Sequence, residues 1–169
     1  MKNIVLIGLM GAGKSSVGKK LSQLSGYDFV DTDDLIEKKL GLTISEIFAQ
    51  RGESFFRELE ASVILELSSQ ERLIISTGGG SLQNPLNLEN LKQNGFLVYL
   101  KTTPESLYGR IKNEKHRPLL CNDNPLATLK ELLIKREEQY LQADFTIDTT
   151  DKAIDEITNE ILKVYNENI

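Results

Sequence analysis

The chain has 169 residues, of which 40% are hydrophobic and 27% are charged, and its formal net charge is −5. These values are typical of one globular domain that buries a core without disulfides, and the negative charge argues against a broad nucleic-acid-binding surface. Cys121 is the only cysteine and His116 the only histidine, which excludes an internal disulfide and a Cys/His zinc site. The sequence shows no signal peptide and no long apolar run, so we expect a cytoplasmic protein, and a monomer by default.

Short apolar runs alternate with helical patterns along the whole chain. Helical patterns are predicted at 16–24, 35–40, 43–50, 53–67, from 103 onward, at 125–142 and at 151–165, and the apolar runs lie at 4–7, 29–30, 73–75, 96–100 and 145–147. This alternation predicts an α/β fold, with a parallel sheet covered by helices on both faces. Ligands of such sheets bind beyond the carboxyl ends of the strands, so the residues after each run should converge on one cleft.

The first run is followed by G-L-M-G-A-G-K-S at residues 8–15, which matches the phosphate-binding P-loop pattern G-x-x-x-x-G-K-[ST]. The glycines let several backbone N–H groups point at one place, and the following helix adds its positive N-terminus. In this pattern Lys14 reaches the β- and γ-phosphates of a nucleotide, and the hydroxyl of Ser15 binds magnesium. A glycine-rich turn without function does not account for the strand before the motif and the helix after it.

The second run is followed by Asp31-Thr32-Asp33-Asp34. Asp31, at the tip of the strand, can bind magnesium directly or through water. Asp33 can accept a hydrogen bond from a substrate hydroxyl and act as a base. Capping of the next helix by one of these acids is an equally good interpretation, and the two are compatible because three acids are present.

The third run is followed by Ser76-Thr77 and then by Gly78, Gly79 and Gly80. A tight turn needs only one or two glycines, so three at a strand end indicate a place where the backbone approaches a ligand. A flexible connection is the alternative.

Two arginines stand out. Arg136 follows Leu129, Leu132 and Leu133 along one stripe of its predicted helix, where a leucine is expected. An arginine at such a position either extends to the edge of the apolar face or meets an anion. Arg57 lies off the predicted buried stripe of its helix, and Glu53 and Glu60 are placed to form ordinary surface ion pairs with it.

The segment 113–124 is polar and carries Arg117 at its centre. A long loop of this kind is often a lid, and a lid arginine can stabilise charge on a phosphoryl group in transfer. A surface loop with a solvated arginine is the alternative. We expect a solvated His116 and no chemical role for Cys121.

Taken together, these motifs resemble the shikimate kinase family over nearly the whole chain. The resemblance is carried by the P-loop at 8–15, D-T-D at 31–33, F-R-E-L-E at 56–60, T-G-G-G at 77–80, R-P-L-L at 117–120, and Arg136 with Tyr140. It implies one P-loop kinase domain over 1–169, with a three-layer α/β/α fold, a five-stranded parallel sheet in the order 2-3-1-4-5, substrate-binding helices at about 32–61 and a lid at about 112–124. It also implies transfer of the ATP γ-phosphoryl group to the 3-hydroxyl of shikimate, with magnesium as the cofactor.

The same resemblance implies roles for individual residues. Lys14, Asp33 and Arg117 would be catalytic, and Ser15 and Asp31 would bind magnesium. Shikimate would be bound by Asp33, Arg57, Gly78, Gly79, Gly80 and Arg136. ATP would be bound by Gly11, Ala12, Gly13, Lys14, Ser15, Ser16, Arg110 and Arg117.

Two other functions remain open at this stage. A gluconate kinase would share the P-loop and the lid, but it has less need of two arginines for one small acid. A nucleotide-switch GTPase would need a guanine-reading Asn-Lys-x-Asp run, and the sequence contains none. An inactive structural relative is a third possibility, which the intact set of motifs disfavours.

Overall fold

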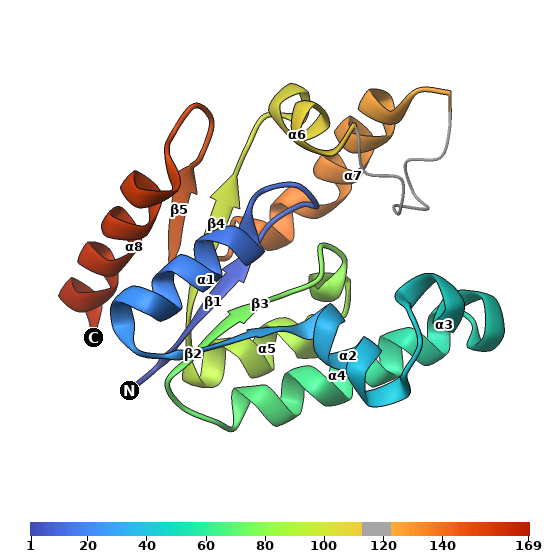
Figure 1. Cartoon of the computed structure of the whole chain (residues 1–169), viewed down its shortest axis with the longest axis horizontal. Helices are drawn as coiled ribbons and strands as arrows, with labels where there is room; N and C mark the ends of the chain where they lie inside the picture. The colour runs from blue at the N-terminus through green and yellow to red at the C-terminus, as the bar shows by residue number, and fades with distance from the viewer. Residues whose placement is uncertain (113–122) are drawn as a thin grey trace.

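The computed structural model describes residues 1–112 and 123–169. The described residues form three layers, a central sheet with helices on each of its two faces (Figure 1). Five strands pair in parallel in the order β2-β3-β1-β4-β5, which confirms the expected 2-3-1-4-5 topology. Their bounds are Asn3–Ile7 for β1, Asp28–Asp31 for β2, Leu73–Ser76 for β3, Gly95–Lys101 for β4 and Phe145–Asp148 for β5. Each predicted apolar run therefore lies within a strand.

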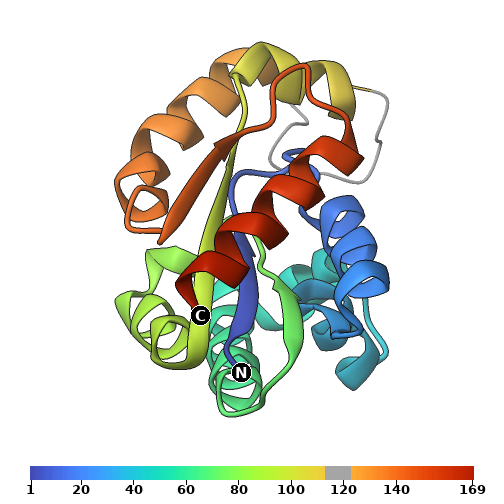
Figure 2. The same cartoon turned by 90° about the vertical axis from the view of Figure 1, so that its left-hand side faces the viewer.

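Helices cover both faces of the sheet, as the alternating pattern predicts. Figure 2 shows α1 and α8 on one face and α4, α5 and α7 on the other. The helices of the described residues are α1 at Lys14–Ser25, α2 at Thr32–Leu40, α3 at Ile44–Arg51, α4 at Glu53–Ser68, α5 at Pro85–Asn94, α6 at Pro104–Ile111, α7 at Pro125–Tyr140 and α8 at Ile154–Asn168. None of them is both long enough and apolar enough to cross a bilayer.

Helix α5 and the short 3₁₀ turn η1, Ser81–Gln83, have no counterpart in the sequence prediction. Leu88 and Leu91 of α5 are buried, but Leu86 is exposed, so the apolar positions form no long stripe. In a segment of this length such a weak pattern does not indicate a helix, and only packing against α4 reveals it.

Predicted apolar faces of three helices need correction. The spacing of Phe55, Leu59, Val63 and Leu67 predicts one buried stripe in α4. Val63 and Leu67 are buried, but Phe56 and Glu60 complete the inward face, and Phe55 and Leu59 are only partly buried. The buried Glu60 hides this face from a search for apolar spacing. The helical spacing also groups Leu24 with Val17 and Leu21, and predicts that Ile154 faces inward, but both Leu24 and Ile154 are exposed near their helix ends.

The central strand β1 is buried along its whole length, and α1 packs close to the sheet beside it. A Cβ atom at Gly18 of α1 would lie 2.3 Å from the ring of Phe29. Glycine at this position therefore brings the start of α1, and the P-loop before it, close to the carboxyl end of β2.

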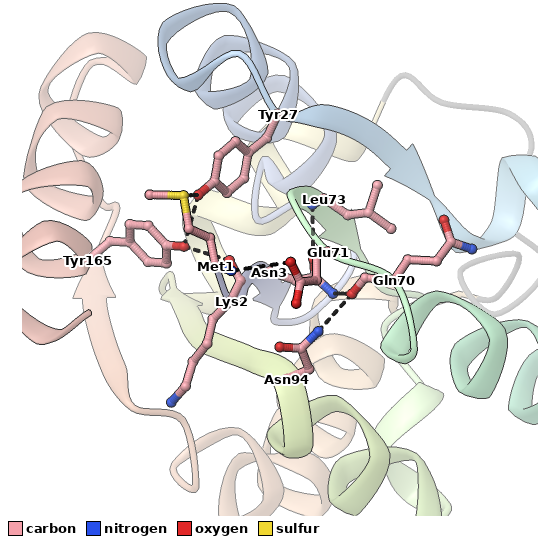
Figure 3. Close-up of polar contacts among 9 residues, drawn as sticks. All are labelled: Met1, Lys2, Asn3, Tyr27, Gln70, Glu71, Leu73, Asn94 and Tyr165. Atoms are coloured by element: carbon pink, nitrogen blue, oxygen red, sulfur yellow. Dashed lines mark hydrogen bonds and ion pairs between the residues drawn. The ribbon is translucent and has the colours of Figure 1, made fainter.

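Polar side chains tie the strands together at the amino end of the sheet (Figure 3). The amide of Asn3, which is buried, donates to the carbonyl of Gln70 at 2.9 Å and accepts from the N–H of Leu73 at 2.9 Å. Beside it, the hydroxyl of Tyr165 donates to the carbonyl of Lys2 at 2.5 Å and lies 3.3 Å from the hydroxyl of Tyr27. Each of these groups is satisfied by the protein itself.

Candidate active site

The P-loop forms at the carboxyl end of β1, where the motif predicted it. Gly8, Gly11 and Gly13 have positive φ angles of 145°, 79° and 91°, which side chains other than glycine rarely adopt. Gly13 precedes α1 and supplies no side-chain cap, so the first amides of the helix point outward. The ammonium of Lys14 donates to the carbonyls of Gly8 and Leu9, at 2.7 and 3.0 Å, which holds it over the loop.

Asp31 caps the helix that follows it and also presents its carboxylate to the P-loop. One carboxylate oxygen accepts from the backbone N–H groups of Asp33 and Asp34 and caps α2. The other accepts from the hydroxyls of Ser15 and Ser76, each at 2.9 Å. The cap thus fixes the orientation of a carboxylate that faces the P-loop serine.

Asp33 points its carboxylate between the P-loop and the glycine segment 78–80. Its Oδ1 is buried with no hydrogen-bond partner among the described residues, and a Cβ atom at Gly78 would lie 2.9 Å from it. Burial, together with the negative charges of Asp31 and Glu60, raises the pKa of Asp33 to about 7, although Lys14 and Arg57 act in the opposite direction. A carboxyl group with such a pKa is suited to exchange a proton near neutral pH.

Arg57 is held by two glutamates of its own helix. Its guanidinium lies 2.9 Å from Glu60 and 3.4 Å from the exposed Glu53. Glu60 is buried and also accepts a hydrogen bond from the hydroxyl of Ser81 at 2.8 Å. The ion pair is therefore more than the surface contact that the spacing suggests, since it joins α4 to the end of the glycine segment.

Arg136 occupies the inward face of α7 and is only 7% exposed. Its Nη1 lies 3.5 Å from the position of a Cβ atom on Gly79. No carboxylate of the described residues forms an ion pair with it. A buried guanidinium of this kind is suited to bind an anion from outside the described protein groups.

The three glycines lie among the other predicted site residues. A Cβ atom on Gly79 would lie 3.3 Å from the backbone nitrogen of Met10 in the P-loop, and one on Gly80 would lie 2.8 Å from Arg57. Such crowding excludes larger residues and explains the run of glycines better than flexibility does.

Arg110 of α6 lies on the other side of the P-loop. Its guanidinium donates to the carbonyl of Gly11 at 3.2 Å and to that of Thr149 at 3.3 Å. It therefore joins the P-loop to the segment after β5. Arg117, His116 and Cys121 lie outside the described residues, as does most of the expected lid at about 112–124.

Several side chains of the site make contacts that no sequence motif predicts. Ser76 and Ser81 interact with acidic partners far away in the sequence, and Thr32 accepts from the N–H of Gly78 at 3.1 Å. Tyr140 donates from its hydroxyl to the carbonyl of Gly79 at 2.5 Å. The pairing of Arg136 with Tyr140 one turn later was the only signal, and it did not reveal the contact with Gly79.

The fold and the site together define a P-loop kinase, in which a phosphate-binding loop lies beside a carboxylate and cationic side chains. A family profile described as "Shikimate kinase" matches residues 10–166 of the chain. The chain belongs to the shikimate kinase family.

Individual relatives agree with this assignment. The chain is 44% identical over 165 residues to a protein named shikimate kinase from Caldanaerobacter subterraneus subsp. tengcongensis. The aligned region covers 98% of this chain and 96% of the relative. The chain is also 45% identical over 165 residues to one from Thermodesulfovibrio yellowstonii, with 98% and 95% covered.

Solved structures give the same result. The structure of shikimate kinase from Acinetobacter baumannii in complex with shikimate matches with a TM-score of 0.95 at 42% identity, and covers 99% of this chain and 94% of that one. A gluconokinase from Sinorhizobium meliloti matches with a TM-score of 0.60 at 20% identity, which is a likeness of fold alone.

Proposed function

We propose that this protein transfers the γ-phosphoryl group of ATP to the 3-hydroxyl of shikimate, which yields shikimate 3-phosphate and ADP on the route to chorismate and the aromatic amino acids. The observation that carries the proposal is the placement of Arg57, Arg136 and Asp33 around a glycine segment that touches the P-loop. The A. baumannii relative, which binds shikimate, supports it further.

Shikimate is a small ring with a carboxylate and vicinal hydroxyls, and the pocket offers a partner for each. Arg136, buried and without an ion pair among the described residues, suits the carboxylate, and Arg57 is placed to assist it. Gly79 and Gly80 bring the backbone close to Arg136 and Arg57, and Gly78 lies beside the carboxylate of Asp33, which we propose as the partner of a hydroxyl.

On the nucleotide side, the proposed ATP contacts are the P-loop residues Gly11, Ala12, Gly13, Lys14, Ser15 and Ser16, with Arg110 beside them. The outward amides at the start of α1 and the ammonium of Lys14 suit the β- and γ-phosphates. Lys14 then stabilises the charge that spreads over the oxygens of the transferred phosphoryl group.

Asp33 orients the 3-hydroxyl for attack on the γ-phosphorus and takes its proton. The pKa of about 7 supports this role, because a carboxylate with that pKa is ionised in part at neutral pH and accepts a proton readily. Asp31 and Lys14, which flank it, belong to the nucleotide side of the pocket.

An ATP-using kinase works with a metal ion, and Mg²⁺ is the ion we propose. Mg²⁺ prefers oxygen ligands and is usually held by one or two carboxylates together with phosphate oxygens. The hydroxyl of Ser15 and the carboxylate of Asp31, 2.9 Å apart, fit that donor set. When bound, Mg²⁺ would neutralise part of the charge on the nucleotide phosphates.

The remaining expectations stay predictions. Arg117 and the lid at about 112–124 are proposed to close over the phosphates and exclude water. We also propose one kinase domain over 1–169, a substrate-binding region at about 32–61, and a monomer that works in the cytoplasm.

The test is ADP release with ATP and Mg²⁺ in the presence of shikimate, gluconate or neither. We expect ADP release to depend on shikimate, with the background rate alone in the other two reactions. Lys14→Met serves as the control, since it should lose about 10²- to 10³-fold in rate. Equal rates in all three reactions, or stimulation by gluconate only, would overturn the proposal.

A further inference from the structure

We propose that Tyr140 is a positioning residue, whose hydroxyl fixes the peptide between Gly79 and Gly80 so that the N–H of Gly80 is presented to the carboxylate substrate. The inference rests on the proposed function and adds to it a residue that does not itself touch the substrate. It starts from the hydrogen bond between Tyr140 and the carbonyl of Gly79, at 2.5 Å.

Tyr140 is a rigid anchor. The side chain is 1% exposed, and its ring packs against that of Tyr99, with the ring centroids 5.0 Å apart. Burial raises the pKa of Tyr140 to about 12, against the charge of Arg136 and a side-chain hydrogen bond with it, so the hydroxyl remains protonated at all working pH values. Tyr140 also follows Arg136 by one turn of α7, which couples the anchor to that arginine.

The peptide that Tyr140 holds lies between the two arginines of the site. Gly79 approaches Arg136 and the P-loop, while Gly80 approaches Arg57. Among the described residues, the N–H groups of Gly79 and Gly80 donate to no protein acceptor. Two backbone donors are thus left for a ligand at the place where the two guanidinium groups converge.

Because the peptide is planar, the contact between Tyr140 and the carbonyl of Gly79 also sets the direction of the Gly80 N–H. The C=O and N–H of a trans peptide point in opposite directions, and the described chain has no cis peptide bond. With the carbonyl of Gly79 fixed toward the hydroxyl of Tyr140, the N–H of Gly80 points away from that hydroxyl. Glycines rotate more easily than other residues, so without the anchor this peptide would sample other orientations.

The experiment compares Tyr140→Phe with Tyr99→Phe, a matched control. Both substitutions remove one buried hydroxyl and keep the ring, but the hydroxyl of Tyr99 has no hydrogen-bond partner among the described residues. We expect Tyr140→Phe to raise the KM for shikimate about fivefold, equivalent to about 1 kcal/mol for one hydrogen bond. The KM for ATP and the kcat should stay within about twofold, and Tyr99→Phe should leave all three unchanged.

A purely structural role predicts something else, namely that Tyr140→Phe has a lower melting temperature but an unchanged KM for shikimate, and that result would overturn the inference. If Tyr140→Phe does not fold, the wild-type protein labelled with ¹⁵N-glycine gives the answer. Shikimate should then slow solvent exchange of the Gly80 amide, and an unaffected amide contradicts the inference. A wild-type protein without shikimate-dependent ADP release overturns the proposed function as well, whereas an active wild type beside an unaltered Tyr140→Phe overturns the inference alone.

Discussion

Polar side chains gather at both ends of the sheet, but their hydrogen bonds are completed in different ways. At the amino end, the buried amide of Asn3 uses its oxygen for Leu73 and its nitrogen for Gln70. At the carboxyl end, Oδ1 of Asp33 is buried without a partner among the described residues, and Arg136 is buried without a carboxylate from them.

This difference distinguishes buried polar groups that stabilise the fold from buried polar groups that are available to a ligand. A buried polar group that the protein satisfies stabilises the fold, whereas one that it leaves unsatisfied costs free energy, which a bound ligand can recover. The carboxyl end is the place where this topology brings ligands. Substitutions at the two ends should therefore affect different measurements, activity at one end and stability at the other.

The largest expected effect is that of Asp33→Asn. It removes the proposed base, so kcat should fall by about 10²- to 10⁴-fold. In the wild type, kcat/KM should fall as the pH drops through about 7, because protonation of Asp33 removes the acceptor of the hydroxyl proton. A pH profile of kcat/KM for both proteins tests this, since the variant should lack that limb. A wild-type profile without an inflection between about pH 6 and 8 would contradict the assignment.

The same substitution should stabilise the fold at high pH. The pKa of Asp33 is higher in the folded protein than its ordinary value of 3.8, so the folded state binds more protons than the unfolded state between that value and about 7. Stability from this group is therefore present below about pH 4 and is lost as the pH rises through 7. Asp33→Asn should melt higher than the wild type at pH 8, by about 2–4 °C for each kcal/mol, and the gap should shrink toward pH 5.

Arg136→Ala is expected to have the next largest effect, and it should act on substrate affinity. Truncation of one member of a buried charge pair costs about 2–5 kcal/mol, so the KM for shikimate should rise by about 30-fold or more. The KM for ATP should change far less, because the proposed role of Arg136 is to bind the carboxylate of shikimate. Steady-state kinetics with each substrate varied measures both, and a KM for shikimate within about twofold of wild type would remove the carboxylate role.

Asn3→Ala tests the amino end of the sheet and should leave both KM values unchanged. It deprives the buried N–H of Leu73 of its acceptor, so we expect a loss of about 1–3 kcal/mol of stability. Asn94→Ala is the matched control, since Asn94 donates to the same carbonyl of Gln70, at 2.8 Å, from a more exposed position. Thermal unfolding should rank the wild type and Asn94→Ala above Asn3→Ala. A changed KM or kcat in Asn3→Ala would contradict the claim that the amino end of the sheet affects stability alone.

The two ends also differ in how far the sequence predicts them. The P-loop and the pair Asp31 and Asp33 were found because each is a contiguous motif at the end of an apolar run. Arg136 was found because a charge interrupts an apolar stripe. Asn3 gave no such signal, since its partners Gln70 and Leu73 are brought beside it only by the pairing of β1 with β3.

Contacts between elements explain the other omissions in the same way. The bond from Tyr140 to Gly79 and the bond from Ser81 to Glu60 join residues that no local pattern connects. Glu60 also explains why the buried face of α4 was predicted incorrectly, because a search for apolar spacing does not include a buried carboxylate. Arg117, a lid residue by family resemblance, lies outside the described residues and remains a prediction.

The smallest expected effect separates the two partners of Arg57. Glu53 is 68% exposed and lies 3.4 Å from the guanidinium, so Glu53→Gln should change stability by less than about 1 kcal/mol and leave the KM for shikimate within about twofold. Glu60→Gln should raise that KM more and destabilise the fold more, because Glu60 is 1% exposed and binds both Arg57 and Ser81. Kinetics and thermal unfolding of the two variants, each with the same change of charge, provide the comparison. Equal effects would mean that Arg57 is held by charge alone, and that its link through Glu60 to the glycine segment has no part in placing it.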